Sequence, residues 1–280
     1  YMWLAAQPAG EELAVPQLAV IRDPARSPIF FQHAAGGKTV FRAMFKNFIP
    51  PSFLTEKTFA PFAEIRVRRG DVDVTETVLS RKQLAGIDGW IYTITVAEEM
   101  PAGTYAVDVR YTDKLKAYPW HPYIDLKWFY QPGYKWVVAN PAGSLLNAIY
   151  LHPTDVWFRV PAKTDSFTIR TNNKNAVLKL RSSRGRNIKT ETAVWRIDAD
   201  TEDQDVTWHL TFHPDIRVPY LQIDGIPPFI ALSEESLFVP DTQIEVPAEA
   251  STAPGPDENT GMGESLHLTN GREVTLPTGA

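Results

Sequence analysis

The sequence predicts an all-β protein built from two β-sandwich domains in tandem. Short apolar runs with alternating polar residues are broken by Pro, Gly, Asn and Asp at roughly 8–12-residue spacing, which is typical of sandwiches and barrels. The 23 prolines favour strands and turns, because proline disrupts the interior of a helix. A chain of 280 residues is also long enough for two domains that each bury a core.

The composition argues against several classes of protein. Hydrophobic residues make up 44% and charged residues 22%, as in folded soluble proteins, and no apolar run reaches the roughly 18 residues of a membrane-spanning helix. The absence of cysteine excludes disulfides, thiolate metal sites and cysteine nucleophiles. Residues 241–280 carry seven acidic residues and one arginine, so the net charge of -5 leaves -5 - (-6) = +1 on residues 1–240. Such a balanced surface argues against nucleic-acid binding.

The first domain is expected at residues 16–130, after an N-terminal extension at residues 1–15. The strands predicted in it are Gln17–Arg22, Thr39–Phe45, Ala63–Arg68, Trp90–Val96 and Thr104–Tyr111. Residues 100–109 read MPAGTYAVDV, a Pro–Gly turn that leads into a strand. This turn resembles the one before a late strand of immunoglobulin-like and fibronectin-like modules, which implies an immunoglobulin-like sandwich.

The second domain is expected at residues 131–240. The strands predicted in it are Val156–Val160, Ser166–Thr171, Val177–Ser182, Ala193–Asp198, Val206–Phe212 and Tyr220–Asp224. Four pieces follow one another in a familiar order: VWFRVPAKTDSF at 156–167, LKLRSSRGR at 178–186, VTWHL at 206–210 and DGIPPFIA at 224–231. They resemble strands and turns of jelly-roll, galactose-binding-like modules of bacterial glycoside hydrolases and other exported proteins. The chain departs from that pattern at Lys163, where glycine is usual, and at Ser182 and Ser183, which replace Asp-Pro.

Residues 241–280 form an acidic tail rich in Pro and Gly. Its part at 247–263 lacks the apolar residues that could offset the entropy of ordering, so we expect a disordered linker there. Alternation around Asn270 and Gly271 then predicts a hairpin.

An aromatic segment at residues 119–136 is the strongest functional signal. Trp and Tyr rings stack on the apolar faces of sugars, while neighbouring polar groups bind the hydroxyls. The predicted carbohydrate-binding residues are Trp120, Tyr123, Asp125, Trp128, Tyr130 and Trp136. The alternative is that these rings fill a seam between the two domains, because large aromatic residues are commonly buried.

An acidic run at residues 198–205 is the candidate metal site. The predicted ligands are Asp198, Asp200, Asp203 and Asp205. Calcium prefers six to eight oxygen ligands, and jelly-roll carbohydrate modules often hold a structural calcium. The alternative is a solvated turn between two strands.

No catalytic residues are predicted. The sequence contains no H-E-x-x-H motif, no G-x-S-x-G elbow, no P-loop and no Gly-rich dinucleotide turn. His209 and His213 stand four residues apart, but a strand would separate them by about 13 Å. We therefore do not expect this segment to be an enzyme.

The leading hypothesis is a non-catalytic accessory module of an exported, bacterial protein that binds polysaccharide or cell-surface glycan. Because the chain begins at Tyr1 instead of Met, we expect a cut or processed N-terminus. The resemblance to modules of exported proteins implies an extracellular, periplasmic or cell-surface location. One alternative is a structural or adhesive surface scaffold. Another is the C-terminal part of an enzyme whose catalytic domain lies upstream of Tyr1.

Overall fold

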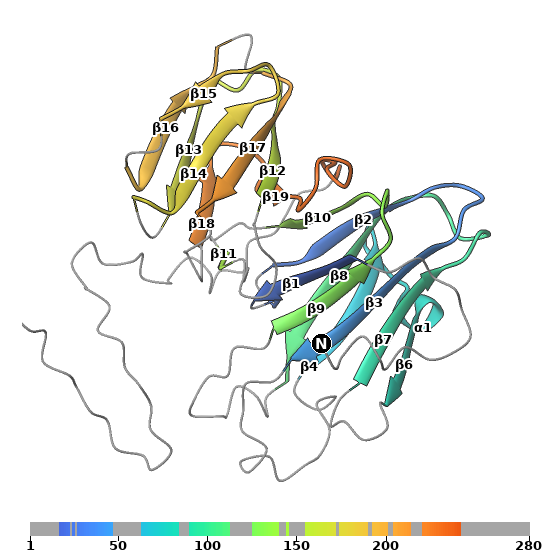
Figure 1. Cartoon of the computed structure of the whole chain (residues 1–280). Helices are drawn as coiled ribbons and strands as arrows, with labels where there is room; N and C mark the ends of the chain where they lie inside the picture. The colour runs from blue at the N-terminus through green and yellow to red at the C-terminus, as the bar shows by residue number, and fades with distance from the viewer. Residues whose placement is uncertain are drawn as a thin grey trace, which may run out of the picture. The chain divides into compact units, whose positions relative to one another are not determined.

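The chain is all-β in its computed structural model (Figure 1). The structure describes residues 17–22, 24–25, 27–46, 63–83, 90–112, 125–139, 144–145, 155–171, 174–189, 192–200, 204–213 and 220–241. Within these ranges the one helix is α1 (Thr75–Val78), a single turn. Among the same residues no helix has the length and hydropathy needed to cross a bilayer.

Two antiparallel sheets form the first sandwich, coloured blue to green in Figure 1. Sheet A has the order β1-β9-β3-β7-β6, and sheet B has the order β19-β10-β2-β8-β4-β5. The strands of sheet A are β1 (Gln17–Arg22), β9 (Asp125–Tyr130), β3 (Thr39–Lys46), β7 (Trp90–Val96) and β6 (Leu79–Gln83). Those of sheet B are β19 (Phe229–Ile230), β10 (Trp136–Ala139), β2 (Ile29–His33), β8 (Gly103–Tyr111), β4 (Ala63–Arg69) and β5 (Val72–Asp73).

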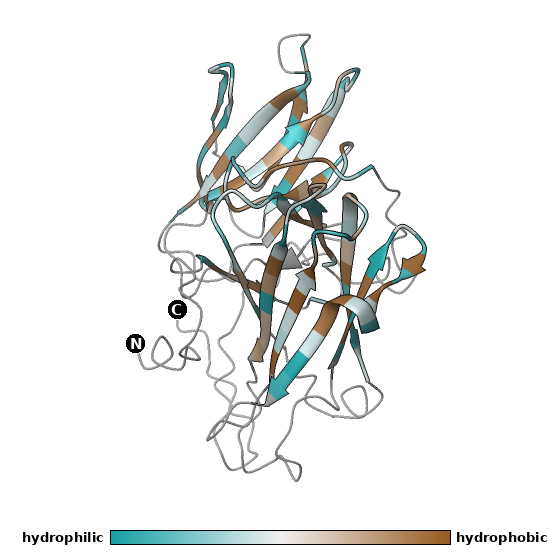
Figure 2. Ribbon diagram, turned by 90° about the vertical axis from the view of Figure 1, so that its right-hand side faces the viewer, coloured by the Kyte–Doolittle hydropathy of each residue, from teal (hydrophilic) through white to brown (hydrophobic). Residues whose placement is uncertain are grey.

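Alternation along the strands produces the core of the first sandwich. In β4, Ala63, Ile65 and Val67 are buried, while the residues between them lie at least partly in solvent. Figure 2 shows this alternation as bands of opposite hydropathy along the ribbons. The ring centroids of Phe31 in sheet B and Phe41 in sheet A lie 4.8 Å apart, so the buried faces of the two sheets meet. Each such side chain contributes roughly 1.5–3 kcal/mol on burial.

The second sandwich, coloured yellow to orange in Figure 1, also consists of two antiparallel sheets. Sheet C contains β11 (Ser144–Leu145), β18 (Tyr220–Asp224), β13 (Ser166–Thr171) and β16 (Val194–Asp198), in that order. Sheet D contains β12 (Asp155–Val160), β17 (Val206–Phe212), β14 (Val177–Ser182) and β15 (Asn187–Ile188), in that order. Phe167 of sheet C lies edge-on to Trp208 of sheet D, with ring centroids 5.4 Å apart, at the centre of this core.

The two sandwiches share one connectivity. When β6, β10 and β19 are set aside, the strand order of the second sandwich repeats that of the first. Strands β11, β12, β13, β14, β15, β16, β17 and β18 take the places of β1, β2, β3, β4, β5, β7, β8 and β9. This differs from the immunoglobulin-like arrangement expected for the first domain, in which the first two strands are neighbours in one sheet. In this chain β1 and β2 lie in different sheets.

Strand β10 belongs to the first sandwich, although the sequence predicted a domain boundary before it. It pairs with β2 on one side and with β19, near the end of the described chain, on the other. Directly after β19, Ala231 forms an isolated bridge with Trp157 of β12. Main-chain pairing therefore connects sheet B to sheet D. A small apolar cluster with Phe30, Val137 and Phe229 covers the junction.

Most of the predicted strands are confirmed. The bounds of β7, β13, β14, β17 and β18 agree with the predicted ones. Strands β2, β9 and β10 were not predicted as strands; β9 and β10 fall in the segment interpreted as an aromatic junction. The expected glycine-like turn does occur at Lys163, which adopts φ of 64°. Residues 1–15, the linker at 247–263 and the hairpin around Asn270 lie outside the described residues.

Candidate functional site

Three of the predicted carbohydrate-binding rings lie in the core of the first sandwich. Trp128 and Trp136 are 0% exposed and Tyr130 is 7% exposed. The ring of Trp128 stacks on that of Phe41 at 4.8 Å, and Tyr130 packs on Trp136 at 4.6 Å. Because β9 runs between β1 and β3, alternate residues of β9 point toward sheet B. These rings have no free face on which a sugar could stack. They fill the interior of the first sandwich and do not form an exposed binding face.

The remaining residues of that prediction are not placed. Trp120 and Tyr123 lie outside the described residues. Asp125 begins β9, where its backbone pairs with Arg22 and Lys46, but its side chain also lies outside the described part. Sugar binding by these three residues stays a prediction.

The predicted calcium ligands that the structure describes each lie near an arginine. Asp205 Oδ1 lies 2.7 Å from Arg159, whereas Asp198 and Asp200 lie 3.8 Å from Arg196 and Arg186. Asp203 lies outside the described residues. Within the described part of the chain, no group of three or more His, Cys, Asp or Glu residues is placed to hold a metal ion. Calcium binding by this run stays a prediction.

A different group of polar and aromatic side chains lies on the outer face of sheet D. Residues opposite each other in an antiparallel pair share one face of the sheet. The register of β12, β17 and β14 therefore places Asp155, Thr211 and Lys179 in one row across the sheet. The next row consists of Trp157, His209 and Arg181. We call these six residues the sheet D face.

Asp155 holds the centre of the sheet D face together. Its Oδ1 accepts a hydrogen bond of 2.6 Å from the Thr211 hydroxyl and lies 2.8 Å from Nε2 of His209. An ionised carboxylate only accepts hydrogen bonds. Nε2 of His209 is therefore the protonated nitrogen that donates the hydrogen bond to Asp155. The side chains of His209 and Asp155 are 19% and 27% exposed, so they are partly shielded. This leaves Nδ1 of His209 and Oδ2 of Asp155 as polar atoms with no bonding partner among the described residues.

Trp157 stacks on His209. Their ring centroids lie 4.6 Å apart and the planes are inclined by only 12°, so the imidazole is fixed from two sides, by this ring and by Asp155. Trp157 is half-buried and packs against the apolar cluster at the junction of sheets B and D. Its backbone N–H donates to the carbonyl of Ala231 over 2.9 Å. Sheet pairing therefore holds Trp157 on both sides while part of its ring stays in solvent.

The Asp155–His209–Thr211 group differs from the triad of serine hydrolases. In a triad the carboxylate and the nucleophilic hydroxyl bind opposite nitrogens of the imidazole. In this chain Asp155 and Thr211 both approach Nε2, and the Thr211 hydroxyl donates to the carboxylate. The hydroxyl proton is thus directed away from the imidazole. This geometry orients hydrogen-bonding groups and does not activate Thr211 as a nucleophile.

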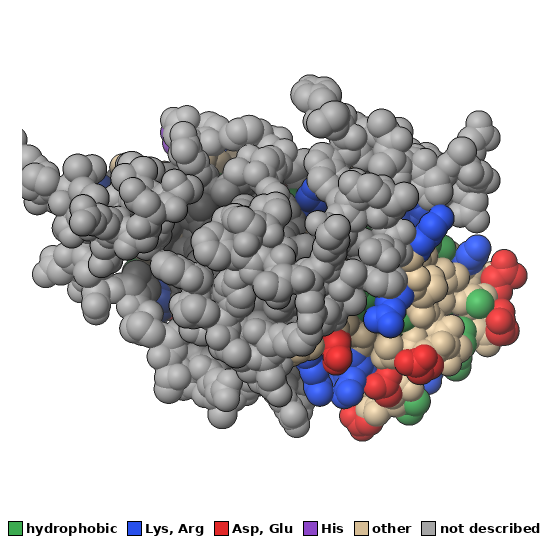
Figure 3. Space-filling model, turned by 90° about the horizontal axis from the view of Figure 1, so that it is seen from below, with side chains coloured by type: hydrophobic (Ala, Val, Ile, Leu, Met, Phe, Trp, Pro, Cys, Tyr) green, Lys and Arg blue, Asp and Glu red, His purple; other side chains and the backbone are tan. Residues whose placement is uncertain are grey.

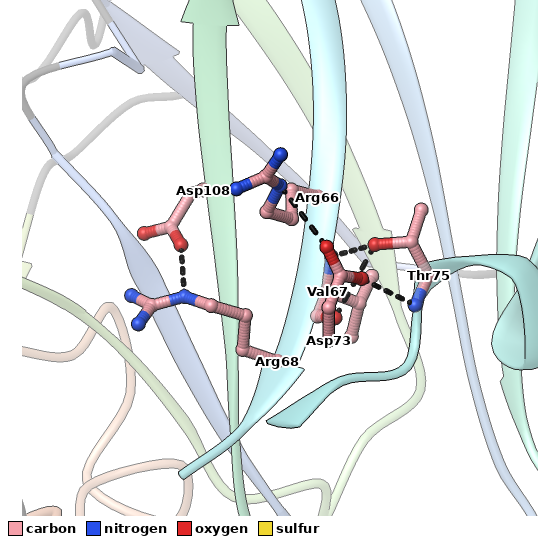
Figure 4. Close-up of polar contacts among 6 residues, drawn as sticks. All are labelled: Arg66, Val67, Arg68, Asp73, Thr75 and Asp108. Carbon is pink, nitrogen blue, oxygen red and sulfur yellow. Dashed lines mark hydrogen bonds and ion pairs between the residues drawn. The ribbon is translucent and has the colours of Figure 1, made fainter. Parts of the chain in front are cut away.

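The equivalent face of the first sandwich is the outer face of sheet B, where two arginines form ion pairs with aspartates (Figure 4). Arg68 Nε lies 2.7 Å from Asp108 Oδ2, and Arg66 Nε lies 3.1 Å from Asp73 Oδ2. Asp73 also accepts a hydrogen bond of 3.0 Å from the backbone N–H of Thr75. The hydrogen bond to Asp108 raises the pKa of Arg68, and hydrogen bonds from Thr75 lower the pKa of Asp73. Both arginines are thereby neutralised within the sheet.

Sequence reasoning did not identify the sheet D face, although one signal was present. The β12 segment alternates Asp155, Trp157 and Arg159 with buried Val156, Phe158 and Val160. The signal is Trp157, a large aromatic residue at a position that the alternation assigns to solvent. The residues of β17 and β14 that complete the sheet D face lie far from β12 in the sequence, and only the strand register brings them next to Trp157.

Comparisons of the chain with protein-family models, with curated proteins and with solved structures found no match.

Proposed function

We propose that the chain is a non-catalytic, carbohydrate-binding module of an exported protein, and that the sheet D face is its binding site. The observation that carries the proposal is the half-buried Trp157 stacked on His209 beside polar atoms that the fold leaves unused. Sugar-binding sites combine an aromatic surface with a few well-positioned polar groups.

The polar atoms of the face match what a saccharide offers. Sugar hydroxyls both donate and accept hydrogen bonds. Oδ2 of Asp155 can accept from one hydroxyl and Nδ1 of His209 from another, while the exposed Lys179 and Arg181 donate. The exposed parts of Trp157 and His209 lie between them and contact the apolar C–H groups of the sugar ring. Because Asp155 and His209 are already fixed by protein contacts, little side-chain entropy is lost on binding.

The strand connectivity supports the same proposal. Eight strands arranged as two four-stranded Greek-key sheets form a jelly roll, an architecture that lectin domains use. We propose that both sandwiches are jelly rolls, with β6, β10 and β19 as additions to the first. This agrees with the resemblance of residues 156–231 to galactose-binding-like modules, and it extends the assignment to the first domain.

Affinity electrophoresis through gels that contain polysaccharide tests the proposal. The purified chain should migrate more slowly in at least one such gel, and Trp157→Ala should lose most of the retardation. Arg196→Ala is the control, because Arg196 lies on the outer face of sheet C with a side chain that is 76% exposed. Circular dichroism checks that each variant is folded. A chain that no polysaccharide retards contradicts the proposal, as does retardation that survives Trp157→Ala.

A second candidate function is a surface scaffold that assembles through strand edges. The strands β5 and β16 lie at the edges of sheets B and C, and they carry Val72 and Val194, which are 63% and 48% exposed. Unpaired edges with exposed apolar residues can pair with another chain. Light scattering over a wide concentration range distinguishes the two functions, because a scaffold associates without sugar and a monomeric binding module does not.

A further inference from the structure

The two cationic side chains of the sheet D face have no counter-charge. Within the described residues, the side chains of Lys179 and Arg181 form no ion pair and no hydrogen bond, and both residues are exposed. The one carboxylate of the face, Asp155, is already bound to His209 and Thr211. Lys179 and Arg181 therefore contribute an excess of positive charge to this face.

Their positions are set by regular pairing. Lys179 and Arg181 stand two residues apart on β14, so they point to one side of the sheet about 7 Å apart. Arg181 lies between His209 of β17 and Asn187 of β15, and Lys179 lies beside Thr211. Both cations thus lie near the Trp157–His209 stack, on β14, which pairs with β17 along most of its length.

The same positions in the first sandwich show that the fold can neutralise such cations. Strand β4 corresponds to β14, and its Arg66 and Arg68 are paired with Asp73 and Asp108. Other arginines of the second sandwich have aspartate partners: Arg159 on the outer face of sheet D pairs with Asp205, and Arg170 on that of sheet C pairs with Asp224. Within the described residues, the lack of an ion pair at Arg181 is therefore not imposed by the fold or by the outer face of sheet D.

We propose that the sheet D face binds an acidic polysaccharide, with the carboxylate or sulfate groups of the sugar on Arg181 and Lys179. This inference rests on the proposed function and names its ligand class. Arg181 presents a planar fork of donors that matches a carboxylate or one edge of a sulfate, and Lys179 adds a point charge beside it. The ring that bears the acidic group lies against Trp157 and His209. Nδ1 of His209 forms a hydrogen bond with a hydroxyl of the same ring.

Charges of both signs are mixed on the described part of the surface that Figure 3 shows, where Lys and Arg side chains lie among Asp and Glu side chains. The whole chain has a net charge of -5, so long-range attraction does not draw polyanions to it. Binding of an acidic polysaccharide must then come from a local group of cations. It should weaken as salt screens these exposed charges.

The test is affinity electrophoresis of the full chain against matched polysaccharides. Polygalacturonate and its methyl-esterified form share one backbone, and esterification replaces the charged carboxylate with a neutral methyl ester. Dextran sulfate and dextran form the matching sulfate pair. We expect retardation by at least one acidic member and weaker retardation by its neutral partner. Which of the two pairs responds distinguishes a carboxylate ligand from a sulfate ligand.

Two double variants with equal charge change complete the experiment. Lys179→Gln with Arg181→Gln should weaken retardation by the acidic polymer at least about tenfold, since two charge-assisted contacts are lost. Arg170→Gln with Arg196→Gln removes the same charge from the outer face of sheet C and should change the retardation less than about twofold. Equal binding of charged and neutral polymers overturns the acidic ligand while sugar binding stands, and so does an unaffected Lys179/Arg181 variant. If none of the four polymers and no other polysaccharide is bound, the proposed function fails as well.

Discussion

The outer faces of sheets B and D occupy equivalent places in two sandwiches that share one connectivity. They differ in whether their cationic side chains have ion-pair partners among the described residues. On sheet B, Arg66 and Arg68 are neutralised by aspartates from β5 and β8. On sheet D, Lys179 and Arg181 have no such partners in the described residues, and the strand beside them supplies His209 and Thr211 instead. The difference teaches that two sandwiches with one connectivity can carry different outer-face side chains, because these residues lie outside the core.

The aromatic residues follow the same division. In the first sandwich Trp128 and Trp136 are buried among other rings, whereas in the second Trp157 stands on the outer face beside His209. A tryptophan packs the core in the first case, and in the second it is the ring that we propose for sugar recognition. The predictions below test this contrast, from the largest expected effect to the smallest.

Replacing Trp128 by Ala should destabilise the first sandwich most. The side chain is 0% exposed and stacks on Phe41, so its removal leaves a cavity and costs about 3–5 kcal/mol of unfolding free energy. Urea unfolding followed by tryptophan fluorescence measures it. A loss below about 1 kcal/mol would mean that the ring does not pack as described, since removal of a buried tryptophan ring typically lowers the unfolding free energy by about 3–5 kcal/mol.

Alkaline pH should unfold the first sandwich. Burial raises the pKa of Tyr92, Tyr105 and Tyr130, which all lie in its core. Their folded pKa values lie above the unfolded value of about 10, so their contribution to stability is complete below pH 10. It is lost as the pH rises through the folded pKa values. Absorbance at the tyrosinate band and circular dichroism, recorded together, should show ionisation of these tyrosines coinciding with unfolding; ionisation well before unfolding would contradict their burial.

The Arg68–Asp108 pair should contribute measurably to stability. With side chains 39% and 21% exposed, the pair is partly shielded, and a double-mutant cycle with Arg68→Ala and Asp108→Ala should give a coupling of about 0.5–1 kcal/mol. The cycle is measured by urea unfolding. Because solvent screens exposed charges, the coupling should fall in high salt. A coupling of zero would remove the contrast drawn between sheets B and D.

Replacing Arg181 by Ala should change stability least. The side chain is exposed and has no described ion-pair partner, so the free energy of unfolding should stay within about 0.5 kcal/mol of the wild type. Urea unfolding run alongside Asp108→Ala provides the comparison. A loss similar to that of Asp108→Ala would indicate that Arg181 supports the fold, which would weaken its assignment to a binding face.

The fold was largely predictable and the candidate site was not. Alternation in segments such as 166–171 and 206–212 identifies strands with the bounds that the structure has, since alternation is a local property. The aromatic segment at 119–136 misled the functional prediction, because a ring that stacks on a sugar and a ring that fills a core have the same composition signal. Whether Trp128 is exposed depends on β9 running between β1 and β3.

The sequence by itself determined that the chain is all-β, where most strands lie and that its charge is nearly balanced outside the tail. These properties follow from the period of two along each strand and from composition. Only the tertiary structure decided that the two sandwiches share one connectivity and that Trp157 meets His209. It also decided that, among the described residues, no aspartate pairs with Arg181 as Asp108 does with Arg68. The physical reason is that pairing joins residues far apart in the chain, as in Gln17 with Tyr130, and a register between distant strands leaves no local mark in the sequence.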